Sequence, residues 1–401
     1  MPIDLEAVRE DTPGCRNRIH FNNAGASLMP RPVLKTVVRH LELEAKIGGY
    51  EAADAERERV EAVYRSCARL INCSPEEVAL LENATRAWDA IFYAIPFRAG
   101  DRIVTGRAEY CSNYMAYLQV ARSTGAEIVV IGDDEEGQID VEELRTTIDD
   151  RVKLISLSHV PTSGGLVNPA AAVGEVARDA GVLFLLDACQ SVGQMPIDVA
   201  EIGCDFLAST GRKFLRGPRG TGFLYVDRRL IGDLHPPVVE VGSADWTQTN
   251  AYTLKEDAKR FETWEVSYAL QLGLGRAVEY ALEQGIDAIW ERVRRLGEDL
   301  RRQLEEIDGI SVHDLGATKC GIVTFTADRV DSEQLAARLL DESVNVHVSK
   351  PSDTRLDFEG RSLGSMIRAS VHYYNTDDEI ARFCELVDEL TTGDERPAAL
   401  E

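Results

Sequence analysis

The sequence has little that would tie it to a membrane or to a nucleic acid. No apolar run is long enough to cross a bilayer, and the N-terminus lacks the basic and apolar regions of a signal peptide. Basic residues number 44 against 68 acidic ones, which gives a formal net charge of -24. Nucleic acids and anionic lipids both select a basic surface. We therefore expect a cytoplasmic protein with no nucleic-acid and no membrane partner.

Cysteine is also sparse, with 8 residues scattered through 401. None of them forms a CxxC pair, and none has the Cys/His spacing of a metal site. A chain of this length can bury a sizeable core without a disulfide framework. We expect reduced thiols and no bound metal.

What the sequence does contain, between residues 78 and 226, is an alternation of short apolar segments with helix-like segments. A helix is predicted over 169–180, with Gly181 as its C-cap. The predicted strands are 102–105, 127–131, 153–158, 182–186, 206–209 and 222–226. Strands that alternate with helices predict an α/β fold with a mostly parallel, doubly wound sheet. In such sheets, ligands bind at the carboxyl ends of the strands.

The pattern changes after about residue 264. Two long helices are predicted over 268–284 and 289–306, followed by shorter segments that mix strands and helices, including strands over 344–348 and 366–371. We interpret this part as a smaller α+β domain. The predicted units are an N-terminal arm (1–19), a large domain (20–263), a small C-terminal domain (264–392) that the arm joins, and a tail (393–401).

Two charged residues follow predicted strands of the large domain. Asp187 closes the apolar strand 182–186, where it either faces the ligand crevice or caps the next helix. Lys213 follows the strand 206–209 and is one of only eight lysines. Taken alone, Lys213 is best interpreted as an ordinary surface lysine. An acid and a lysine at neighbouring strand ends, however, suit a cofactor that needs both a partner for a pyridinium and an imine-forming amine.

Three motifs surround these residues: Leu-Asp-Ala-Cys-Gln-Ser (186–191), Asp-Phe-Leu-Ala-Ser-Thr-Gly-Arg-Lys (205–213) and Gly-Pro-Arg-Gly-Thr-Gly (217–222). With Phe-Asn-Asn-Ala-Gly (21–25) and the segment 368–376, they resemble the class V aminotransferase-fold enzymes. That group includes cysteine desulfurases, selenocysteine lyases, isopenicillin N epimerase-like proteins and sulfoxide C–S lyases. The resemblance implies the type I fold of pyridoxal 5'-phosphate (PLP) enzymes, a seven-stranded, mostly parallel large-domain sheet, an amino-acid substrate and a homodimer.

The resemblance also implies roles for five residues of these motifs. Lys213 would form the Schiff base with PLP and later move the substrate α-proton. Asp187 would pair with the pyridine nitrogen and keep it protonated. Gln190 would contact the phenolic oxygen of the ring. Thr210 and Arg212 would bind the phosphate, Arg212 standing where the family usually has His.

The segment 83–86 precedes a predicted helix, and its backbone amides suit an anion. The resemblance assigns Ala84, Thr85 and Arg86 to the PLP phosphate, although a plain N-cap by Asn83 or Thr85 accounts for the pattern equally well. Tyr110 occupies the position from which an aromatic side chain stacks on the PLP ring. Desulfurases usually have His there, and we count Tyr110 among the catalytic residues.

The remaining implied contacts concern the substrate. Thr162 replaces an Asn that normally contacts the phenolic oxygen of PLP. Arg368 would bind the substrate α-carboxylate in a bidentate fork, although an Arg on such a strand is more often solvated. Asn23 and Gly25 would line the substrate cleft, an interpretation compatible with a simple turn.

The sequence contains no cysteine between Cys320 and Cys384. A persulfide-forming desulfurase needs a mobile cysteine shortly before the position of Arg368, and the matching loop, 349–361, has none. Cys111 and Cys189 lie in motifs near the cofactor but are better interpreted as small apolar residues. We therefore expect a C–S lyase acting on a cysteine S-conjugate or sulfoxide, with an epimerase or an aminotransferase as alternatives and a desulfurase disfavoured.

Overall fold

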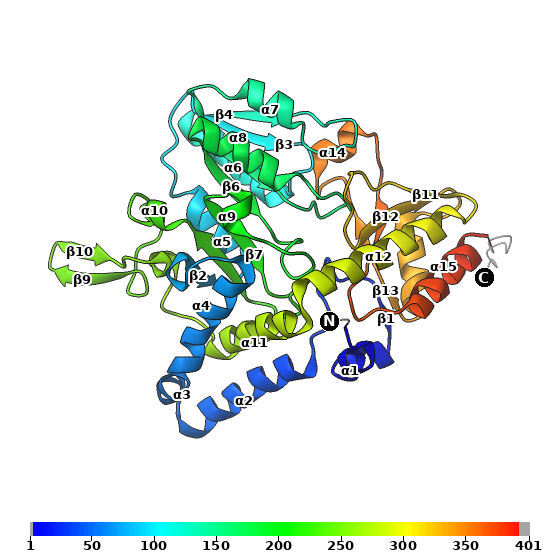
Figure 1. The fold of residues 1–401 in the computed structure, drawn as a ribbon, viewed down its shortest axis with the longest axis horizontal. Coiled ribbons are helices and arrows are strands. Elements are labelled where there is room, and N and C mark those ends of the chain that lie inside the picture. Colours follow the sequence, from blue (N-terminus) through cyan, green and yellow to red (C-terminus); the bar gives the residue numbers. More distant parts are fainter. Residues whose placement is uncertain (1–2, 393–401) are drawn as a thin grey trace, which may run out of the picture.

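The computed structural model describes residues 3–392, and its centre is a seven-stranded sheet (Figure 1). In spatial order the strands are β2 (Val78–Leu81), β8 (Gly222–Val226), β7 (Phe206–Thr210), β6 (Leu183–Asp187), β5 (Val152–Ser158), β3 (Arg102–Gly106) and β4 (Glu127–Ile131). Only β8 runs against its neighbours. The predicted mostly parallel, seven-stranded α/β sheet is confirmed, with strand ends that differ from the prediction by one residue at most.

Helices cover both faces of this sheet, because successive residues of each strand point to opposite sides. Leu186 of β6 belongs to one apolar core, together with residues of α8 (Ala170–Ala180). Leu185 belongs to the other, together with residues of α5 (Ala84–Phe92) and α6 (Cys111–Thr124). Gly181 ends α8 in the left-handed conformation, with φ 67°, as predicted. Shorter helices complete the layers: α7 (Val141–Thr147), α9 (Val199–Ile202) and α10 (Arg228–Ile231).

Four further helices lie beside the sheet. The predicted helix 268–284 is α11 (Tyr268–Gln284), and it packs against α2 (Arg31–Ile47) and α4 (Arg57–Ile71), which α3 (Gly49–Ala55) connects. These three N-terminal helices were not predicted from the sequence. Also not predicted was a hairpin, β9 (Ala244–Gln248) and β10 (Ala251–Leu254), that projects from the body of the molecule (Figure 1).

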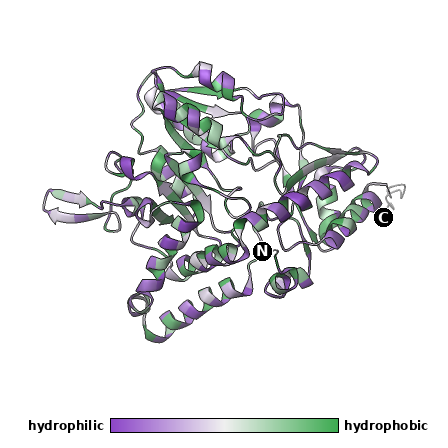
Figure 2. Ribbon diagram, in the orientation of Figure 1, coloured by the Kyte–Doolittle hydropathy of each residue, from purple (hydrophilic) through white to green (hydrophobic). Residues whose placement is uncertain are grey.

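The second layer holds a four-stranded antiparallel sheet in the order β11 (Ile310–Val312), β12 (Ile322–Ala327), β15 (Met366–Ser370) and β14 (His347–Ser349). Its helices are α12 (Ile286–Glu305), α13 (Ser332–Asp341), α14 (Arg355–Gly360) and α15 (Asp377–Thr392). Apolar residues of α12, such as Leu296 and Leu300, pack into its core, and polar residues occupy the outer face of this helix (Figure 2). The smaller α+β unit expected after residue 264 is therefore present.

The N-terminal arm contributes to this second layer. After α1 (Leu5–Glu10), β1 (Ile19–His20) pairs in parallel with β13 (Val344–Asn345). The segment 344–348, predicted as one strand, is divided between β13 and β14. The domain limits, including the division at residue 264, remain a prediction, and the tail 393–401 lies outside the described residues. No helix within 3–392 is both long enough and apolar enough to cross a membrane.

Candidate active site

The last residues of three adjacent parallel strands meet at one cavity. Ser158 ends β5, Asp187 ends β6 and Thr210 ends β7, and all three line a cavity of about 580 Å³. Parallel strands that start from one edge of a sheet also end together at the other edge, which explains why residues so distant in sequence meet here. The cavity therefore lies where the α/β topology predicts a ligand site.

Most of the residues singled out from the sequence surround this cavity. Its lining includes Ala84, Thr85, Arg86, Tyr110, Thr162, Asp187, Gln190, Thr210, Arg212 and Lys213. Arg219, to which the sequence analysis gave no role, also lines it. The three predicted substrate contacts, Asn23, Gly25 and Arg368, are not among the residues that line it.

Asp187 is buried, and both of its carboxylate oxygens accept hydrogen bonds. The backbone N–H of Cys189 donates to Oδ1 at 3.0 Å, and Nδ2 of Asn113 donates to Oδ2, also at 3.0 Å. Asn113 reaches the site from the first turn of α6. These two donors fix the orientation of the carboxylate toward the cavity.

A second buried acid, Glu109, lies behind Asp187. Its Oε1 accepts from Ser158 Oγ at 2.6 Å and from Asn113 Nδ2 at 3.0 Å, and its Oε2 accepts from Tyr117 at 3.0 Å. Burial raises the pKa of Glu109, and the bond from Ser158 opposes that shift. Neither Glu109 nor Asn113 was assigned a role from the sequence, because nothing local indicates that one amide bridges two acids.

Lys213 lies in the loop that follows β7. The N–H of Arg216 donates to the Lys213 carbonyl oxygen at 2.9 Å, and the N–H of Gly217 donates to that of Gly211 at 2.7 Å. Burial lowers the pKa of the Lys213 amine. A tight loop thus presents a desolvated amine whose neutral, nucleophilic form is favoured.

Another part of the cavity lining suits an anion. The amide oxygen of Asn83 accepts from the N–H of Arg86 at 2.9 Å, so Asn83 is the N-cap of α5, and the helix N-terminus opens onto the cavity. Thr210 and Arg212 contribute a hydroxyl and a guanidinium there. Burial and the nearby Arg219 lower the pKa of Arg212. An anion would relieve the repulsion between these two cations.

A hydrogen-bonded chain connects the cavity to Arg368. Nη1 of Arg368 donates to the backbone oxygen of Thr162 at 2.9 Å and to its Oγ1 at 2.8 Å. Gln190 Nε2 donates to the same Oγ1 at 3.2 Å. Gln190 Oε1 and Arg368 Nε are buried and have no partner among residues 3–392. Burial lowers the pKa of Arg368 to about 10.

The turn at 22–25 differs from the expectation. Asn23 is buried and donates to the carbonyl oxygen of Ser370 at 2.7 Å, so its side chain does not line the cavity. Asn22 instead faces Arg368, whose Nη2 donates to Asn22 Oδ1 at 3.4 Å. A Cβ on Gly25 would lie 2.4 Å from that same oxygen, so a larger residue there would displace the Asn22 side chain that faces Arg368.

Tyr110 is the N-cap residue of α6 and lines the cavity. Burial raises the pKa of its hydroxyl, so the side chain remains a neutral phenol at neutral pH. Next to it, the N–H of Cys111 donates to the carbonyl oxygen of Asp353 at 3.0 Å. This bond connects the aromatic position to the loop that precedes β15.

The residues around the cavity fit PLP. An acid, a lysine and an anion site occupy separate parts of one lining, and the unpartnered Gln190 Oε1 indicates that a polar group is still to be satisfied. The model of the family Aminotransferase class-V matches residues 19–383.

The chain belongs to the class-V aminotransferase family. Its cofactor is PLP. It is 30% identical to a probable cysteine desulfurase of Methanothermobacter thermautotrophicus, over 96% of this chain and 98% of the relative. It is 31% identical to a probable cysteine desulfurase of Xylella fastidiosa, over 95% of this chain and 94% of the relative.

A solved structure is also similar to this chain over nearly its whole length. The apo structure of a cysteine desulfurase from Thermococcus onnurineus superposes with a TM-score of 0.91 at 26% identity, and the match covers 98% of this chain and 99% of that one. The similarity to both the relatives and this structure extends over nearly the whole chain, so it includes both sheets and the cavity.

These comparisons contradict the expected reaction. The prediction of a C–S lyase acting on S-conjugates or sulfoxides, with an epimerase or aminotransferase as alternatives, is wrong, because the near-full-length relatives are named cysteine desulfurases. The reasoning relied too heavily on the cysteine-free loop 349–361. A missing thiol in one loop limits where sulfur can go after it leaves the substrate. It does not decide between elimination and desulfuration, since both reactions break a C–S bond.

Proposed function

We propose that the protein is a PLP-dependent cysteine desulfurase, which removes the sulfur of cysteine and leaves alanine. The observation that carries this proposal is the near-full-length similarity to proteins named cysteine desulfurases. A second observation supports the proposal: an acid, a lysine and anion-binding residues line one cavity.

Lys213 and Asp187 form the proposed catalytic pair. PLP, when bound, supplies an aldehyde for amines and a ring that withdraws electrons from the substrate Cα. The amine of Lys213 would hold the cofactor aldehyde between turnovers and would take up and return protons at the substrate Cα and Cβ. Asp187, fixed by Cys189 and Asn113, would keep the pyridine nitrogen protonated.

The anion site is the proposed phosphate site. Ala84, Thr85 and Arg86, at the start of α5, supply backbone N–H groups and a hydroxyl, and Thr210 and Arg212 complete it from the loop after β7. An acidic protein of net charge -24 repels phosphate at long range. This cluster of donors and cations therefore has to supply the local attraction.

The other contacts orient the ring and the substrate. Tyr110 would stack on the ring, and Thr162 and Gln190 would contact its phenolic oxygen, since all three line the cavity. Arg368 binds the substrate carboxylate, which would satisfy its unpartnered Nε. Asn22, which accepts from Arg368, keeps the guanidinium in place.

The sulfur is transferred to an acceptor thiol that lies outside the loop 349–361. In this reaction the C–S bond of cysteine breaks, the acceptor thiol forms an S–S bond with the departing sulfur, and a proton is added to Cβ. The products are alanine and a persulfide, and no external oxidant or reductant is needed.

We also propose a homodimer in the cytoplasm. Large apolar side chains are exposed on the segment 238–264, among them Val238, Val241, Trp246, Tyr252 and Trp264. Exposed apolar groups gathered in one region are typical of an interface. Val238 also lines a hollow of about 170 Å³ that shares Arg86 with the active-site cavity, so a second copy seated there would adjoin the cofactor. The eight unbridged cysteines suit a reducing compartment.

The test is a product analysis with cysteine. Purified holoenzyme is incubated with L-cysteine and dithiothreitol, and alanine, sulfide, pyruvate and ammonia are measured. The proposal predicts alanine and sulfide, both absent with Lys213→Ala. Pyruvate and ammonia in place of alanine would contradict it.

A further inference from the structure

A buried histidine, His372, touches the loop that carries Lys213. It lies just after β15, the strand of Arg368, and is fully buried. Its Nε2 lies 2.8 Å from the carbonyl oxygen of Phe214, the residue that follows Lys213. The two rings of Phe214 and His372 meet edge to face, with centroids 5.3 Å apart.

The hydrogen bonds define the state of this imidazole. The backbone N–H of Tyr373 donates to Nδ1 at 2.9 Å, so Nδ1 is an acceptor. A carbonyl oxygen can only accept, so Nε2 carries the proton that it donates to Phe214. Both ring nitrogens are satisfied only by the neutral Nε2–H tautomer. Burial lowers the pKa of His372 well below its usual value, which agrees with that state.

The same loop is held from two other sides. Gly193 has φ 94°, and a Cβ there would lie 2.5 Å from the carbonyl carbon of Phe214, so the two backbones are in direct contact. Arg216, in the left-handed region with φ 60°, turns its side chain inward and is buried. Its guanidinium donates to the hydroxyl of Tyr373 at 2.7 Å and lies 4.4 Å from the ring centre of Tyr374.

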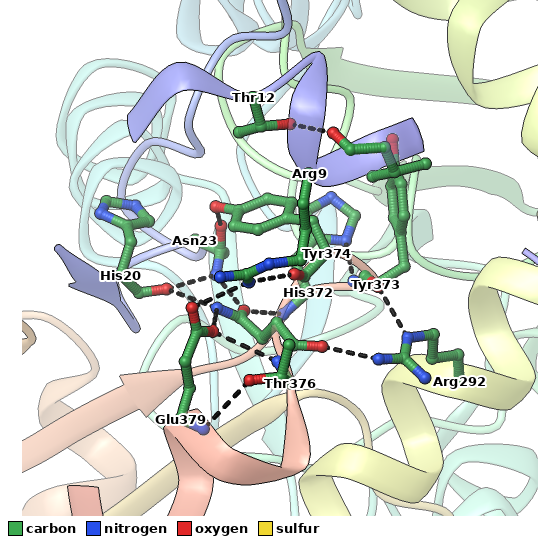
Figure 3. Close-up of polar contacts among 12 residues, drawn as sticks. Arg9, Thr12, His20, Asn23, Arg292, His372, Tyr373, Tyr374, Thr376 and Glu379 are labelled. Carbon is green, nitrogen blue, oxygen red and sulfur yellow. Dashed lines mark hydrogen bonds and ion pairs between the residues drawn. The ribbon is translucent and has the colours of Figure 1, made fainter. Parts of the chain in front are cut away.

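The N-terminal arm closes this cluster from outside. Figure 3 shows Arg9 and Thr12, from the arm, above Tyr373 and Tyr374 from the segment after β15. Nη1 of Arg9 donates to the carbonyl oxygen of Tyr374 at 2.8 Å and pairs with Glu379, also at 2.8 Å. The cluster therefore joins three distant parts of the chain behind the lysine loop.

We propose that His372 is a positioning residue that holds the loop of Lys213 in register with the strand of Arg368. The inference rests on the proposed roles of those two residues. His372 touches neither cofactor nor substrate; it acts by fixing the backbone next to the lysine. Its bond crosses from the segment after β15 to the loop after β7, so it relates the amine to the carboxylate-binding guanidinium.

Two substitutions separate the contacts of this ring. In His372→Gln, the amide can still donate to Phe214. In His372→Asn, the shorter side chain can accept from Tyr373 N–H but cannot reach Phe214. The matched control is Arg9→Gln, which loosens the outer side of the same cluster and leaves the His372 bond intact.

The experiment uses the PLP-bound full chain and measures thermal stability, kcat and KM with cysteine, and the pH midpoint of the absorbance band of bound PLP. His372→Asn should lower kcat about tenfold with KM within about twofold, and should move the pH midpoint by about 0.5 unit or more. His372→Gln should restore both, and Arg9→Gln should alter only thermal stability.

Equal losses in the Gln and Asn variants, or an Asn variant with a wild-type midpoint and kcat, would overturn the inference. A failure of the proposed function would give a different experimental result. A wild-type protein that binds PLP but yields no alanine would contradict that function, and the band would still report whether His372 positions the lysine.

Discussion

Asn113 donates a hydrogen bond of 3.0 Å to Oδ2 of Asp187, and the same nitrogen lies 3.0 Å from Oε1 of Glu109. One amide thus stands between two buried acids. The Asp187 carboxylate is held on its inner side, and its charge is directed toward the cavity. Repulsion between the two acids is reduced by the donor that separates them.

Asn113→Leu keeps the approximate volume of the side chain and removes this donor. We expect kcat to fall by about tenfold to a hundredfold, because Asp187 loses a fixed orientation and faces Glu109 without a shared partner. Steady-state kinetics with cysteine measure this kcat. Ser123→Ala, at an exposed position near the other end of α6, is the control. An unchanged kcat in Asn113→Leu would show that Asp187 does not depend on this bond.

Lys213 should capture PLP at lower pH than an exposed lysine does. Burial disfavours the ammonium form, so the pKa of the amine is lowered from 10.5, and the neutral amine is populated at lower pH. The rate of cofactor attachment to stripped protein, followed by absorbance, should rise with pH to a midpoint below 10.5. Lys213→Ala should show no attachment. A midpoint at or above 10.5 would contradict the burial of this amine.

Arg368→Lys should raise KM for cysteine by about tenfold or more, with a smaller effect on kcat. An ammonium cannot reproduce the planar fork of the guanidinium toward a carboxylate. Arg355→Lys, on the exposed surface of α14, should leave KM unchanged. If Arg368→Lys weakened cysteine and its decarboxylated amine, cysteamine, equally, the carboxylate would not be the group recognised.

Cys189→Ala should retain most of the activity measured with dithiothreitol. Burial and the charge of Asp187 raise the pKa of the Cys189 thiol well above its usual value, so little thiolate exists to attack sulfur. Alanine formation measures the effect. A complete loss of alanine, with PLP still bound, would make Cys189 the sulfur acceptor.

The sequence predicted those features that depend on local pattern. Asp187 and Thr210 follow apolar strands, and Lys213 follows a turn, so their meeting at one sheet edge comes from the α/β alternation alone. The amide of Asn113 could not be placed in the same way. It reaches Asp187 only because α6 packs on the sheet at one angle, and no spacing in the sequence encodes that angle.

Other omissions have similar causes. Asn22 and Asn23 are neighbours of the same type, and only the pairing of this turn with Ser370 decides which one faces Arg368. The helices α2 and α3 bury few side chains (Val33 and His40 in α2, Ala52 in α3), which weakens their periodic signal. The error about the reaction was different in kind, because one cysteine-free loop was treated as evidence against desulfuration.

The most direct test of the account is the stoichiometry of a single reaction. Holoenzyme is mixed with ¹³C-labelled cysteine and a thiol acceptor, and labelled alanine and released sulfur are counted together by mass spectrometry and sulfide assay. The account predicts one alanine for each sulfur, with neither formed by Lys213→Ala. Sulfur released with labelled pyruvate and no alanine would contradict it.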